Sequence, residues 1–199
     1  LRHVAFANLV KTNSSPLQLI IAEFFEDRYA EQGTSLLPKD AFQRAAIRFF
    51  IDQWGQATPV LYALLKNQDR SKDAELKEQL TVKLKAVVDL LKAQSEGPFF
   101  LGEQLSLVCL PTLYFYMQSY LFLSVLTNFY ISQADIACLP FLDRFSATLT
   151  HYRDFDVLAV DERLRQWYAA AKARPCFQET SKEPEFYVDG YKGYALPKL

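Results

Sequence analysis

The stretch ISQADI, residues 131–136, decides the fold class, because it is typical of a helix that begins at the edge of a protein core. With Ser132 as the N-cap, Asp135 occupies the third helical position, so each side chain can accept a hydrogen bond from the other's backbone N–H. Ile131 and Ile136 are spaced to pack on each other as a hydrophobic staple. Such a cap contributes ~1 kcal/mol to helix stability. A structural helix cap at Ser132 and Asp135 is our default interpretation, and a catalytic pair is the alternative.

On both sides of this stretch the apolar residues recur at helical spacing, and no segment shows sustained strand alternation between turns. Further helices are expected over 17–29, from an Asp40 N-cap to about Gln68, from Asp73 to Gly97-Pro98, and from an Asp161 N-cap to Arg174-Pro175. In the second of these, Pro59 either breaks or kinks the helix, and Thr58 could cap the continuation. The stripe of leucines and valines at 76–91 is expected to be buried. The sequence therefore predicts an all-α bundle.

Composition excludes several classes of function. The 199 residues are 50% hydrophobic, and 22 Lys+Arg against 23 Asp+Glu give a net charge of −1, so neither a disordered chain nor a nucleic-acid-binding surface is indicated. The cysteines, Cys109, Cys138 and Cys176, are too widely spaced for a disulfide scaffold. Because His3 and His151 are the only histidines and no Cys-x-x-Cys pair is present, we expect no metal site. The absence of a disulfide pattern favours a reducing compartment such as the cytoplasm, without excluding an organelle.

Residues 105–130 form an apolar, aromatic segment without a charged side chain. About 20 such residues suffice to cross a bilayer, which makes the segment a candidate membrane span. Pro111 and the polar residues Gln118 and Asn128 interrupt it, and no Lys or Arg cluster flanks it. A buried or partner-covered segment is the favoured alternative.

The order of several motifs resembles the glutathione S-transferase family. LIIAEFFEDRY at 19–29 followed by LLPKDAFQRAAIRFFID at 36–52 is similar to the junction between that family's thioredoxin-like domain and its helical domain. EGPFFLGEQ at 96–104, SQADIACLPFLDRF at 132–145 and LRQWYAAAKARPCFQET at 164–180 resemble its later helices. The lambda, omega and dehydroascorbate-reductase-like classes look most similar.

This resemblance implies two parts, a remnant of the thioredoxin-like domain at 1–30 and a helical domain at 31–199 with an apolar insertion at 105–130. The opening residues show no thioredoxin-type active-site turn and no Val-Pro. Leu17-Gln18 stands where the family has a Glu-Ser pair for the γ-glutamyl end of glutathione. No catalytic and no glutathione-binding residue can therefore be carried over from the family.

By resemblance the expected function is glutathione conjugation or glutathione-dependent thiol transfer, with glutathione as co-substrate and a small hydrophobic electrophile, thiol or disulfide as acceptor. The missing motifs predict weak or no activity in this chain. A homodimer is implied. Alternatives are a non-catalytic interaction module and a membrane-associating protein of the same fold.

Candidate functional residues are few. Phe49, Phe50 and Trp54 could line the acceptor pocket, with core packing as the alternative. We expect Cys138 to be a buried, inert thiol. Arg44 and Arg48, with Asp52, form a charged stripe that is either solvated or contacts a partner subunit.

Overall fold

The computed structural model describes residues 15–29, 37–102 and 133–195, and these parts of the chain form helices without a regular strand. The α-helices are α2 (Ser15–Tyr29), α3 (Ala41–Lys66), α4 (Asp73–Gln94), α6 (Gln133–Arg153), α7 (Glu162–Lys172), α8 (Pro175–Thr180) and α9 (Pro184–Ala195). Short 3-10 helices are η1 (Arg70–Lys72) and η3 (Val157–Val160). The predicted all-α class is confirmed.

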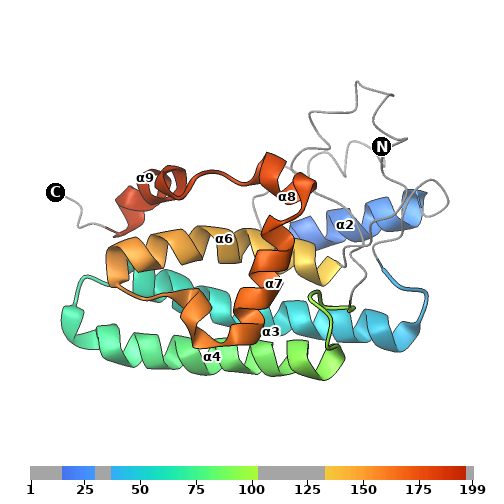
Figure 1. Ribbon diagram of the computed structural model, residues 1–199, viewed down its shortest axis with the longest axis horizontal. Helices are drawn as coiled ribbons and strands as arrows, with labels where there is room; N and C mark the ends of the chain where they lie inside the picture. The colour runs from blue at the N-terminus through green and yellow to red at the C-terminus, as the bar shows by residue number, and fades with distance from the viewer. Residues whose placement is uncertain (1–14, 30–36, 103–132, 196–199) are drawn as a thin grey trace.

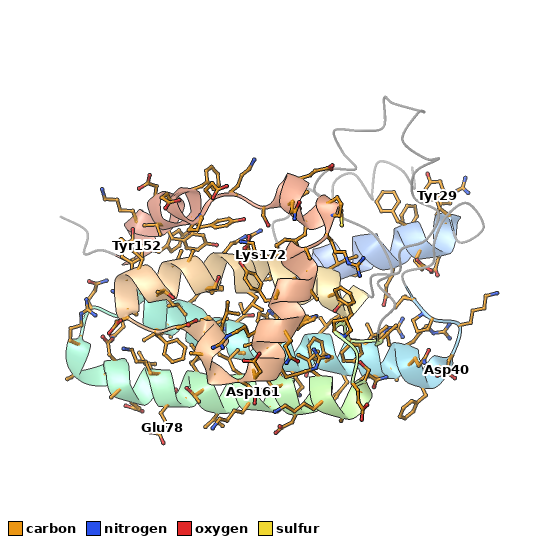
Figure 2. All side chains as sticks on the ribbon, in the orientation of Figure 1. Tyr29, Asp40, Glu78, Tyr152, Asp161 and Lys172 are labelled. Carbon is orange, nitrogen blue, oxygen red and sulfur yellow. The ribbon has the colours of Figure 1, made fainter. Side chains whose placement is uncertain are left out.

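Helix α6 lies at the centre of the arrangement. Figure 1 shows α3 and α4 side by side and antiparallel, with α6 along α3, α9 on the outer side of α6, and α7 crossing the bundle. The core between these helices is made of aliphatic and aromatic side chains, among them Leu61, Leu84, Phe145 and Trp167, all of which are buried. Side chains such as Glu78 on the outer face of α4 point away from the bundle (Figure 2).

Two of the predicted helix starts are confirmed at atomic detail. The carboxylate of Asp40 accepts a hydrogen bond of 2.8 Å from the backbone N–H of Gln43, and that of Asp161 accepts one of 2.8 Å from Arg163. Each satisfies a backbone donor that the helix itself leaves unpaired. Asp73 is the first residue of α4, as expected, and the buried stripe of α4 is Leu80, Leu84, Val87, Val88 and Leu91.

Of the two outcomes predicted at Pro59, a break is excluded, and the predicted cap at Thr58 is wrong. Helix α3 continues through Pro59 to Lys66, and the Thr58 hydroxyl donates to the Trp54 carbonyl at 3.1 Å instead of capping a new helix. Proline removes only the one hydrogen bond to residue i−4, which is Gly55. Because Gly55 and Pro59 are both exposed, water can satisfy the Gly55 carbonyl. Helices α8 and α9 and the two 3-10 turns were not expected from the sequence.

A tight turn at residues 99–102 ends the second described part of the chain, just before residues 103–132. Phe99 and Gly102 exchange backbone hydrogen bonds of 3.0 and 3.1 Å, and Gly102 has φ +97, which favours glycine. The apolar segment 105–130 and residues 1–14 lie outside the described part of the chain. Among the helices that the structure describes, none combines the length and hydropathy needed to cross a bilayer.

Candidate functional site

The three residues proposed for the acceptor pocket do not lie on one surface. Phe50 and Trp54 are buried, and the Phe50 ring packs on Phe100 with ring centres 4.6 Å apart. Phe49 is 54% exposed. Phe50 and Trp54 thus occupy the core positions given above as the alternative, and the pocket role of the three residues stays a prediction.

Asp135 is buried in the first turn of α6 and joins three distant segments. Its Oδ1 accepts hydrogen bonds from Trp167 Nε1 at 2.7 Å and from the backbone N–H of Phe100 at 3.3 Å. A carboxylate at a helix N-terminus also interacts favourably with the helix dipole. This geometry ties the turn after α4 to α6 and α7, which is a structural role. Ser132, the other half of the predicted cap, lies outside the described residues.

Arg163 supports the same turn from α7. Its guanidinium donates to the carbonyls of Gly97 at 2.6 Å and Pro98 at 3.0 Å. Burial lowers the pKa of Arg163, and the nearby carboxylate of Asp135 opposes that shift. No sequence pattern indicates this role of Arg163, because its partners are backbone carbonyls of another segment.

The charged residues Arg48 and Asp52 on α3 have different partners in the structure. Arg48 Nε lies 2.9 Å from Glu23 Oε1 on α2, whereas Asp52 accepts a hydrogen bond of 3.1 Å from Gln56. Arg48 therefore contacts α2 and not Asp52, four residues further along the same helix. Contact of this stripe with a partner subunit stays a prediction.

The thiol of Cys138 lies in an environment that disfavours the reactive thiolate. Burial raises the pKa of Cys138 well above its ordinary value, and the carboxylate of Asp135 adds to the shift. Because the reactive species is the thiolate, a buried thiol with a raised pKa is inert. The expected burial of Cys138 is confirmed, and its inertness stays a prediction. Cys176 is half-buried in α8, and Cys109 lies outside the described residues.

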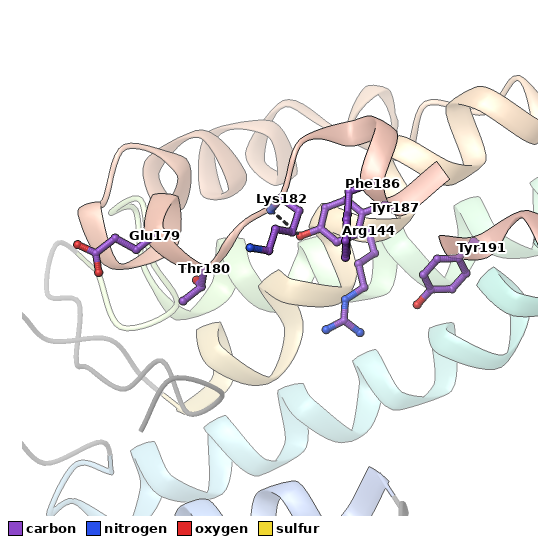
Figure 3. A pocket seen from close by; sticks show the side chains of 7 residues that line it. All are labelled: Arg144, Glu179, Thr180, Lys182, Phe186, Tyr187 and Tyr191. Atoms are coloured by element: carbon purple, nitrogen blue, oxygen red, sulfur yellow. Dashed lines mark hydrogen bonds between the residues drawn. The ribbon is translucent and has the colours of Figure 1, made fainter. Parts of the chain in front are cut away.

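A cleft of about 440 Å³ opens between α6, α8 and α9 (Figure 3). Its volume falls in the range of small-molecule sites. Helix α6 supplies one wall, and the linker from α8 into Pro184 carries the chain across to α9, which supplies the other. The residues that line the cleft are Arg144, Glu179, Thr180, Lys182, Phe186, Tyr187 and Tyr191.

The aromatic wall of the cleft is held in place from behind by a buried carboxylate. Asp143 accepts a hydrogen bond of 2.8 Å from the Tyr187 hydroxyl and one of 2.6 Å from the Tyr168 hydroxyl. Burial and this hydrogen bond to Asp143 raise the pKa of both tyrosines, so their hydroxyls stay protonated donors. Tyr191 contacts Tyr62 of α3 with a distance of 3.5 Å between the hydroxyl oxygens. These contacts fix the rings that face the cleft.

The cleft is also charged. Arg144 and Lys182 contribute two cations, and Glu179 contributes one carboxylate, which lies at the opposite end of Figure 3 from Tyr191. Within the described part of the chain, neither the Arg144 guanidinium nor the Lys182 ammonium makes a hydrogen bond or an ion pair; Arg144 lies over the Phe141 ring at 5.5 Å. Among the same residues, no group of histidines, cysteines and carboxylates could hold a metal ion.

Comparison with known proteins identifies the fold. No protein-family model matches the chain, and no curated protein sequence matches it. Among solved structures it is similar to a trimeric glutathione transferase, TDR1 from Leishmania, with a TM-score of 0.68 and 23% identity over 89% of this chain. It is also similar to glutathione transferase Omega 3C from Trametes versicolor, with a TM-score of 0.64 and 25% identity over 88% of this chain. The chain has the helical fold of the glutathione transferase C-terminal domain.

The match covers only part of each neighbour. The chain spans 34% of the length of the Leishmania protein and 63% of the length of the Trametes protein. Among the described residues, the cleft between α6, α8 and α9 is the candidate ligand-binding site. Sequence reasoning missed it, because α8 and α9 were not expected and the lining residues come from three separate helices and the linker between α8 and α9.

Proposed function

We propose that this chain supplies the acceptor-binding part of a glutathione-transferase-like protein, and that by itself it has weak or no activity toward the glutathione thiol. The observation that carries the first half is the helical-domain fold, shared with two glutathione transferases, together with an aromatic-walled cleft of about 440 Å³. Glutathione is the co-substrate in this proposal, and the acceptor is a small electrophile or disulfide.

The chemistry of the described residues supports the second half. Activation of a thiol needs a hydrogen-bond donor to the thiolate or a cysteine of lowered pKa. Cys138 has the opposite environment, since burial raises its pKa. The hydroxyl of Tyr187 is already committed to Asp143 at 2.8 Å. The cleft can therefore hold an acceptor, whereas the sulfur chemistry would depend on residues outside it.

The test is an activity assay on the purified chain. Glutathione is supplied with 1-chloro-2,4-dinitrobenzene for conjugation and with hydroxyethyl disulfide for thiol transfer, and each rate is compared with that of the uncatalysed reaction. We expect rates close to the uncatalysed ones. Robust turnover that survives Cys138→Ala would show that the chain carries its own thiol-activating group and would refute the inactivity.

A second candidate, a self-associating interaction module, is favoured by one observation on α3. Phe42 is 77% exposed and Phe49 is 54% exposed, and large exposed aromatic side chains are enriched at protein interfaces. We propose a second copy of the chain as the occupant of this face. Light scattering after size exclusion should give a dimer that the double change Phe42→Ser and Phe49→Ser disrupts. Val82→Ser, at a 62% exposed position on α4, is the control, and a monomeric unmodified chain contradicts the idea.

A further inference from the structure

Helix α9 contains two glycines that its packing does not require. Gly190 and Gly193 lie in its second half, and among the described residues a Cβ added at either position would meet nothing within 4 Å. Neither has the positive φ that Gly102 has. Because glycine is the poorest helix former apart from proline, both residues weaken α9 without a gain in packing.

The side chains of α9 also bury little apolar surface. Of its 12 residues, all of which lie in the described part of the chain, Ala195 is the buried one, and Tyr187, Val188 and Tyr191 are half-buried. Helix α4, by contrast, has a stripe of five buried leucines and valines. Helices in proteins gain most of their stability from the packing of an apolar face, so α9 depends on other contacts.

Polar side chains of α3 and α6, or adjacent to them, hold α9 against the bundle. The Tyr152 hydroxyl of α6 donates to the Val188 carbonyl at 2.9 Å. At the end of α9, the Ala195 carbonyl accepts from Arg153 at 2.8 Å and from Gln68 at 3.2 Å. Hydrogen bonds of this kind add only modestly to stability, because water can replace them when the two partners separate.

We infer that α9 is a detachable helix, which leaves the bundle and unfolds as one unit while α3, α4, α6 and α7 remain folded. Segments with few buried apolar contacts are those that open locally in native proteins. Opening uncovers the aromatic face on which Tyr191 packs, formed by Tyr62 of α3 and Phe145 of α6. The inference goes beyond the proposed function and does not depend on it, because α9 opens in the chain without a ligand.

The experiment is hydrogen–deuterium exchange with mass spectrometry on the purified chain, comparing peptides of α9 with peptides of residues 80–91 in α4. Relative to unstructured peptides, α9 should exchange roughly a hundredfold faster than α4, and faster still in urea too dilute to unfold the bundle. Gly190→Ala and Gly193→Ala should each slow α9 exchange about fivefold, because alanine favours the helix. Tyr152→Phe should speed it about fivefold, because the Val188 carbonyl loses its donor.

Gly55→Ala is the matched control. Gly55 lies in α3, and a Cβ there also meets nothing within 4 Å among the described residues. If α9 opens while α3 stays folded, this substitution stabilises the closed and the open form equally. It should therefore slow exchange in α4 about fivefold and leave exchange in α9 unchanged.

The proposal is overturned if α9 exchanges as slowly as α4, or if Gly55→Ala slows exchange in both helices alike. Either result means that α9 opens only when the whole protein unfolds. Exchange of α9 that does not respond to dilute urea also overturns it, because fraying of single hydrogen bonds exposes little surface.

Discussion

Removal of the Arg153 side chain should destabilise the protein more than any change at an exposed arginine. Arg153 is the last residue of α6, is only 3% exposed, and lies where α3, α6 and α9 end on the same side of the bundle (Figure 1). Its guanidinium donates to the carbonyls of Leu64 at 2.9 Å, Leu65 at 2.5 Å, Asn67 at 2.8 Å, Ala195 at 2.8 Å and Tyr152 at 2.8 Å.

The magnitude follows from the carbonyls that would lose their donor. The last carbonyls of a helix have no partner within the helix, and a cation there also interacts favourably with the helix dipole. A buried acceptor left without a donor costs about 1–3 kcal/mol, but water can enter and reach several of these carbonyls at once. We therefore expect Arg153→Met to lower the free energy of unfolding by about 3–4 kcal/mol, a large loss for a single substitution. Arg153→Lys keeps the charge without the planar fork and should lose about 2 kcal/mol.

Urea denaturation followed by far-ultraviolet circular dichroism measures the effect. The midpoint should fall while the slope with urea concentration stays unchanged, because the surface exposed on unfolding is the same. Arg165→Met is the control: Arg165 forms an exposed ion pair of 3.1 Å with Glu162. Its loss should change stability by less than about 1 kcal/mol. An Arg153→Met protein as stable as the Arg165→Met protein would refute the role of Arg153 as a cap shared by α3 and α9.

Further predictions concern titratable groups. The hydrogen bond from Lys92 lowers the pKa of Asp161, so its stabilisation is present above the ordinary aspartate pKa of ~3.9 and is lost as pH falls through the lowered value. Asp161→Asn keeps a capping oxygen but loses the charge that pairs with Lys92, so it should cost about 0.5 kcal/mol at neutral pH and nothing in strong acid. A cost that does not change with pH in urea denaturation would contradict this. Burial and the hydrogen bond with Tyr191 raise the pKa of Tyr62 to about 12. Because the folded value is the higher one, this stabilisation is complete below about pH 10 and is lost as pH rises toward the folded value. Ultraviolet titration of the native chain should show one more late-ionising tyrosine than Tyr62→Phe, in which Tyr168 and Tyr187 still ionise late. Identical titration curves would speak against it. Iodoacetamide at mildly alkaline pH should alkylate Cys138 only after unfolding, as peptide mass mapping would show, whereas equal labelling in native and denatured protein would rule out the burial described above.

The local patterns of the sequence predicted the helices that begin with a side-chain cap or carry a regular apolar stripe. Asp40 and Asp161 each stand before such a helix and accept from the backbone N–H that the capping rule specifies. At Pro59 the pattern left a break or a kink open, and the helix is not broken there, because the exposed Gly55 carbonyl can be satisfied by water. The pattern failed at α9, where Tyr187, Tyr191 and Tyr194 recur at helical spacing but Gly190 and Gly193, which are poor helix formers, interrupt the segment.

The candidate site could not be predicted, because it depends on contacts between segments distant in sequence. Asp143 was visible only as one charge within α6, and nothing near it in sequence indicates that Tyr168 and Tyr187 donate to it. Arg153 and Arg163 are typical surface residues by composition, yet both donate to carbonyls of helix ends or turns elsewhere. Periodicity reports which face of a helix is buried, but not which other segment covers it.

The hydrogen bond between the Phe100 N–H and Asp135 has a consequence for protein engineering. It joins Phe100 and Asp135, which lie on the two sides of the segment 103–132, so the described residues at both ends of that segment are held together. The entropic cost of closing a loop changes by only about 0.6 kcal/mol for each doubling of its length. A shortened protein with a few residues between Gly102 and Gln133, or one that carries a whole foreign domain there, should therefore keep the same helical core. This position is the natural place to graft a reporter.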